Sequence, residues 1–194
     1  MNIIEFQNKA VGEFVDLVAT KTSSGGRAVH PETAISSLAS VAGSLLLRSF
    51  NLRMESIEPG TVVLSNEANE KGPQLIDIMS AFLTNAGVQL DKSLLGGEKA
   101  QRGEAPQLSV LNALSLLQSE ALDIAKRNQL SLEQAAQSAA MATAFVVKEC
   151  APNLRAEIGF NVAAFAFVAG SKTAPPTLAQ GVTPSLKKPW YKLW

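Results

Sequence analysis

Residues 30–50 read HPETAISSLASVAGSLLLRSF, and this stretch decides the fold class. Pro31 suits the first position of a helix, because its missing N–H group would have no intrahelical partner there. Apolar residues then recur three and four positions apart, which is typical of one helix face: Ile35, Leu38, Val41, Ala42, Leu45 and Leu46. The other face carries small residues, Gly43 among them, and a smooth face of this kind lets another backbone approach closely.

Five further stretches show helical periodicity or helix-capping signals. We expect these helices at about 2–21, 73–87, 107–128, 131–150 and 154–169. Ser131 and Gln134 have the spacing of a capping box, and Asn153 is expected to cap the last helix. That last stretch is apolar nearly all round, which is typical of a helix in the centre of a bundle or in an interface.

Residues 52–66 break the helical pattern and contain the sequence Glu58-Pro59-Gly60-Thr61. Pro and Gly stand at the two central positions that a type II turn favours. Apolar residues precede and follow this turn, so we expect a short β-hairpin. Because an isolated two-stranded ribbon is marginal in water, it would pack on the helices or pair with another ribbon, which could come from a second subunit.

The composition changes at residue 171, which divides the chain into a helical domain (1–170) and a C-terminal arm (171–194). The arm contains four prolines and four lysines but no acidic residue, so residues 1–170 hold 13 of the 17 basic side chains and all 17 acidic ones. Trp190, Tyr191 and Trp194 end the chain. We expect these aromatic residues to dock on a groove of the body or of a neighbouring subunit, with a frayed end and attachment to a membrane surface as alternatives.

The whole chain of 194 residues thus predicts a mainly α fold: a compact bundle of about six helices, one short hairpin and an extended C-terminal arm. The N-terminus lacks the uninterrupted apolar run of a secretory signal, and the most apolar run, 158–170, is too short to cross a bilayer. We therefore expect a soluble, cytoplasmic protein without a transmembrane segment.

Composition also limits the chemistry. One Cys excludes an internal disulfide, and one His excludes zinc motifs that need two imidazoles from one chain. The acidic body and the zero net charge argue against nucleic-acid binding. No metal, no cofactor and no catalytic residue is predicted.

The residues most suited to a ligand contact are polar groups within apolar helices. Glu157 and Asn161 stand four residues apart on the most apolar helix, and Arg155 or Arg48 could pair with them if they point inward. His30 is a further candidate, just before a helix. For each of them a structural role is the alternative, and Cys150 is expected to be an inert thiol.

The leading functional hypothesis is a non-catalytic protein that acts through self-association, as a homodimer, or through another protein partner. The grounds are the small-residue helix faces, the hairpin and the aromatic arm. The alternative is a small-molecule-binding protein or enzyme with an apolar pocket between helices, in which Glu157, Asn161, Arg48 or His30 orients the ligand. A third hypothesis is a regulator of another protein, with the acidic body facing a basic partner.

Overall fold

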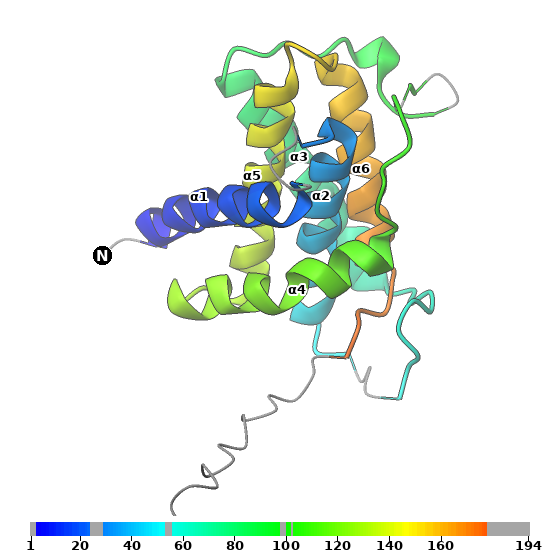
Figure 1. Cartoon of the computed structure of the whole chain (residues 1–194). Helices are drawn as coiled ribbons and strands as arrows, with labels where there is room; N and C mark the ends of the chain where they lie inside the picture. Colours follow the sequence, from blue (N-terminus) through cyan, green and yellow to red (C-terminus); the bar gives the residue numbers. More distant parts are fainter. Residues whose placement is uncertain (1–2, 24–28, 53–55, 98–99, 102, 178–194) are drawn as a thin grey trace, which may run out of the picture.

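A computed structural model describes residues 3–23, 29–52, 56–97, 100–101 and 103–177. They form six α-helices and a short 3-10 turn, so the prediction of a mainly α fold with about six helices is confirmed (Figure 1). The elements are α1 (Ile3–Thr22), α2 (Pro31–Ser49), α3 (Asn66–Asn85), η1 (Lys92–Leu94), α4 (Val110–Arg127), α5 (Leu132–Cys150) and α6 (Ala156–Ser171). No helix in the described part of the chain is both long and apolar enough to cross a bilayer.

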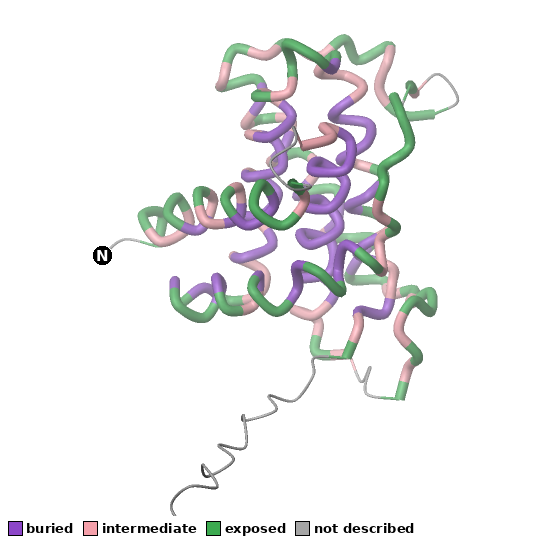
Figure 2. Tube along the Cα trace, in the orientation of Figure 1, coloured by how far each residue is buried: buried purple, intermediate pink, exposed green. Residues whose placement is uncertain are grey.

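Helix α2 lies in the centre of the fold. It contacts every one of the other five helices, and all of its residues from Glu32 to Leu47 are buried. Figure 2 shows this as a continuous buried segment, whereas α1, α3 and α4 alternate between buried and exposed residues. Both the apolar face and the small-residue face predicted for residues 31–49 are therefore covered by protein.

The small-residue face of α2 allows a close contact with α6. A Cβ atom on Gly43 would overlap the carbonyl oxygen of Phe167 and would lie 2.6 Å from the amide nitrogen of Ser171. A Cβ atom on Gly170 would likewise overlap the carbonyl oxygen of Ser40. Because both clashes are with backbone, only glycine fits at these two positions.

The predicted β-hairpin is wrong, although its turn is present. Thr61 donates its backbone N–H to the carbonyl of Glu58 at 3.1 Å, and Gly60 has a φ of +90°, as a type II turn requires. The segment after the turn pairs with the chain beyond α6 through a single bridge, Val62 to Thr173. Residues 53–55 of the expected first strand lie outside the described part.

Three helix starts also differ from the predictions. Helix α4 begins at Val110 and not at 107, because the Ser109 hydroxyl caps the amide of Asn112. Helix α3 begins at Asn66 and not at Pro73, because the Ser65 hydroxyl caps the amide of Ala68 and the helix continues through the proline. Helix α6 begins at Ala156 after Arg155, whose side chain makes no capping bond, so Asn153 is not its cap. The capping box at the start of α5 is confirmed, since both of its hydrogen bonds form between Ser131 and Gln134.

Candidate functional site

An open groove of about 650 Å³ lies between α2, α6, the start of α4 and the segment that leads into α4. We call it the main groove, and we call residues 91–109 the connector. Most of the lining side chains are apolar or small. They are Ser36, Ser40, Gly103, Glu104, Ala105, Pro106, Leu108, Ser109, Val110, Ala113, Val162, Phe165, Ala166 and Ala169.

The hydroxyl groups along the α2 side of the groove already have hydrogen-bond acceptors within the protein. Ser36 donates to the carbonyl of Thr33 at 3.2 Å, and Ser40 donates to the carbonyl of Ser36 at 2.8 Å. At the rim, the side chain of Glu104 is 84% exposed. The groove therefore offers an apolar surface with one carboxylate at its edge.

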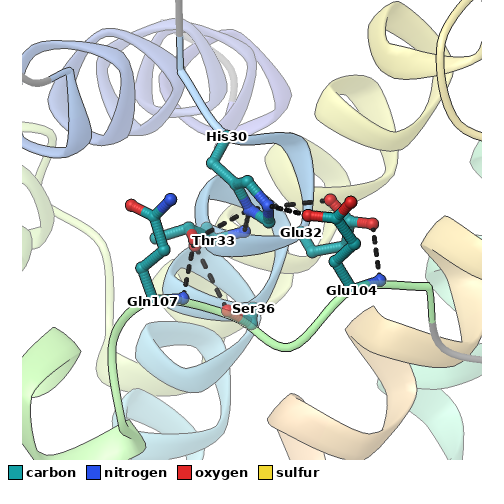
Figure 3. A network of polar contacts seen from close by, with 6 residues as sticks. All are labelled: His30, Glu32, Thr33, Ser36, Glu104 and Gln107. Atoms are coloured by element: carbon teal, nitrogen blue, oxygen red, sulfur yellow. Dashed lines mark hydrogen bonds and ion pairs between the residues drawn. The ribbon is translucent and has the colours of Figure 1, made fainter.

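A polar network at the start of α2 holds one wall of the groove in place (Figure 3). His30 accepts the backbone N–H of Thr33 on its Nδ1 at 3.3 Å, which caps the helix. Its proton then lies on Nε2, which is 3.1 Å from Oε2 of Glu104. The imidazole thus links the helix N-terminus to the connector.

Two further bonds of this network run from the connector backbone to α2. Glu104 donates its N–H to Oε1 of the buried Glu32 at 3.0 Å, and Gln107 donates its N–H to the Thr33 hydroxyl at 2.9 Å. A carboxylate in the first turn of a helix is favoured by the partial positive charge there. Gly103 has a φ of +66°, and a Cβ atom on it would lie 2.5 Å from Glu32 Oε1. These hydrogen bonds therefore hold the connector against the start of α2.

Asn161 on α6 fastens the connector at a second place. Its amide donates to the carbonyls of Leu94 at 2.9 Å and Gln101 at 3.1 Å, and its oxygen accepts the N–H of Gly96 at 3.1 Å. Only 2% of Asn161 is exposed. Both amide hydrogens are used in these bonds, so the side chain serves the fold.

Glu157, one turn before Asn161, accepts the N–H of Asp91 at 3.2 Å. Hydrogen bonds from its own amide and from that of Asp91 lower the pKa of this carboxyl, and Arg155 lowers it further. The two residues of the predicted i, i+4 pair therefore both hold the connector. Neither lines the main groove.

Arg48 lies near the opposite end of α2 from His30, about 27 Å away along the helix axis. One of its guanidinium nitrogens donates to Gln118 Oε1 at 2.8 Å and to the carbonyl of Pro176 at 3.3 Å. Burial lowers the pKa of this guanidinium. The four candidates therefore do not converge: Arg48 holds the chain beyond α6, while the other three hold the connector.

Cys150 ends α5 and is half-buried. Burial raises the pKa of its thiol, and the carboxylates of Glu32 and Glu149 raise it further. A thiol in this setting is a poor nucleophile. Within the described ranges no three His, Cys, Asp or Glu residues are placed to hold a metal ion. The predicted arm residues Trp190, Tyr191 and Trp194 lie outside the described part.

The chain matches no protein-family model, no curated protein and no solved structure. An apolar pocket between helices was one of the alternatives, but its position and lining were not predicted, because the walls come from three helices and a connector whose packing the sequence does not specify. One signal was available: the small residues of α2 include Ser40, which lines the groove.

Proposed function

We propose that this protein acts without catalysis, by self-association, and that the main groove is where one copy binds another. The groove is the observation that carries the proposal. It is open, has a volume of about 650 Å³ and is lined mainly by apolar and small side chains. An open apolar surface of this kind is stabilised by covering it with apolar groups of a partner.

The polar groups around the groove support a binding role. His30, Glu32 and Thr33 make hydrogen bonds that hold the connector against α2. They give the groove a fixed wall before any partner arrives. A pre-formed wall lowers the conformational entropy that binding would otherwise cost.

The volume of the groove favours one second candidate, binding of a small apolar molecule. Pockets for such ligands commonly measure about 300–1,000 Å³. The groove falls within that range, with Glu104 as an exposed polar group at its rim. Mass spectrometry of the purified protein under non-denaturing conditions tests this candidate, because a co-purified small molecule adds its own mass to each copy.

Sedimentation equilibrium of the full chain tests self-association. We expect the mass to rise from monomer to dimer with concentration, and Ala169→Lys to shift this transition to at least roughly tenfold higher concentration, because it places a charge in the apolar groove. Ala164→Lys is the matched control, on the same helix and not a lining residue. A chain that stays monomeric at its highest soluble concentration would contradict the proposal.

A further inference from the structure

The described chain ends close to the main groove. The carbonyl of Pro176 accepts hydrogen bonds from Gln118 at 2.8 Å and from Arg48 at 3.3 Å. Gln118 stands five residues beyond Ala113, which lines the groove, and this spacing is about 7.5 Å along α4. The last described residues are therefore held at a fixed point, about one and a half turns of α4 beyond the groove.

The course of the chain before that point leads away from the groove. Helices α2 and α6 run parallel, since Gly159 lies against Ile35, whereas Gly170 lies against Ser40. After α6 the chain continues in the same direction to Pro176, which lies near the far end of α2 at Arg48. An arm that filled the groove of its own copy would have to turn back after Pro176, because the groove lies at Ser36 and Ser40 and Pro176 lies at Arg48.

We propose that the main groove is filled by residues 178–194 of a second copy of the chain, in a reciprocal exchange of arms. This inference rests on the proposed function, self-association. Fully extended, 17 residues span roughly 55–60 Å, which is about twice the length of α2 and enough to reach the groove of a partner. In a two-fold dimer, each arm fills the groove of the other copy, so neither groove is left open.

The chemistry of the arm fits the groove. Trp190, Tyr191 and Trp194 supply large apolar surfaces for an apolar cleft, and each aromatic side chain can bury about 150–250 Å². Lys187 and Lys188 precede them, and residues 178–194 contain no acid. The exposed carboxylate of Glu104 at the rim complements this positive charge and orients the arm.

The arm also provides its own probe, because Trp190 and Trp194 are the only tryptophans in the chain. The experiment measures tryptophan emission and its quenching by acrylamide in the full chain, over the concentration range used for sedimentation. We expect the emission to shift to shorter wavelength, and quenching to fall, in step with the rise in mass. Ala169→Lys should abolish the shift over that range, whereas Ala164→Lys should keep it.

A second variant measures the anchor directly. Trp190→Ala leaves Trp194 as the fluorophore, and loss of an aromatic anchor at the centre of an interface commonly weakens binding by about thirtyfold. Because both arms of the two-fold dimer lose their anchor, we expect the dimer dissociation constant to rise by that factor twice over, roughly a thousandfold, with unchanged monomer stability. A Trp190→Ala chain that dimerises as tightly as the wild type would overturn the inference.

The other outcomes separate this inference from the proposed function. If the mass doubles while the emission stays constant, the chain self-associates but the arm is not the occupant. If the emission is shielded and independent of concentration in a monomer, the arm docks on its own copy, and both the exchange and self-association are refuted. If the chain is monomeric with accessible tryptophans, both proposals also fail.

Discussion

Replacing Gly43 by alanine tests the close contact of α2 with α6. The added methyl group would overlap the carbonyl of Phe167 and approach the amide nitrogen of Ser171 to 2.6 Å. Carbon contacts in proteins lie near 3.5–4.0 Å, so relieving the closer of these two contacts requires the helices to separate by roughly 1 Å or more. The atoms in the way are backbone atoms, which cannot turn aside as a flexible side chain can.

The size of the effect follows from two opposing terms. Overpacking a well-packed core costs about 1–3 kcal/mol, and a backbone clash places Gly43→Ala at the upper end. Alanine is favoured over glycine inside a helix by about 1 kcal/mol. We therefore expect Gly43→Ala to lower the free energy of unfolding by about 2 kcal/mol.

Urea denaturation followed by far-UV circular dichroism measures this change, and Gly12 supplies the control. Gly12 lies inside α1, and a Cβ atom on it would meet no atom within 4 Å. Gly12→Ala keeps the helix-propensity term alone and should raise stability by about 0.5–1 kcal/mol. If Gly43→Ala were as stable as Gly12→Ala, the helices would not be in backbone contact, and the central packing described above would be wrong.

Three further results are expected. Asn161→Ala removes three hydrogen bonds to the connector, so it should lower the free energy of unfolding by about 1–3 kcal/mol and speed cleavage of the connector in limited proteolysis. Asn112→Ala, at an exposed position, should change neither. The folded-state pKa of Glu157 is depressed, so its ionised carboxylate stabilises the fold above the ordinary glutamate pKa of about 4.3. That stabilisation is lost as the pH falls through the folded-state pKa. Glu157→Gln should therefore lose less stability than the wild type in acid denaturation. His30→Ala should lower the free energy of unfolding by about 1 kcal/mol in urea titrations. His30→Asn should lower it by less, because asparagine restores a capping acceptor. Equal losses in the two variants would show that the cap contributes nothing.

The helices were predictable because their signals are local. The start of α2 follows from Pro31, and the start of α5 follows from the spacing of Ser131 and Gln134. Each signal acts within one turn of helix, so the sequence alone contains it. The capping role of the His30 side chain is equally local, but histidine is not among the residues that commonly cap.

The errors arose where distant segments decide the structure. The turn at Pro59-Gly60 formed as predicted, yet its backbone partner is the chain after α6, more than 100 residues away. Pro73 suggested a helix start, but Ser65 capped an earlier one, and the extra turns bury Ala68 and Gly72. Local patterns show where a turn or a cap can form but do not show which remote segment pairs with it.

The candidate site shows the same limit. Asn161 was expected to need hydrogen-bond partners inside the protein, and it has them, but they are backbone groups of the connector and not Arg48. Arg48 bonds instead to Gln118 and Pro176. A polar residue on an apolar helix predicts that bonds will form, whereas the identity of the partners depends on loop paths that have no periodic pattern.

The burial of α2 has a consequence for how the protein unfolds. An amide in this helix meets solvent only after the surrounding helices have moved away, because α2 touches all five of them. Hydrogen exchange at its central amides should therefore require opening of the entire molecule, whereas α1, which is exposed along one side, can exchange through smaller fluctuations. The protein is thus organised around one segment that cannot become accessible without the loss of its whole native structure.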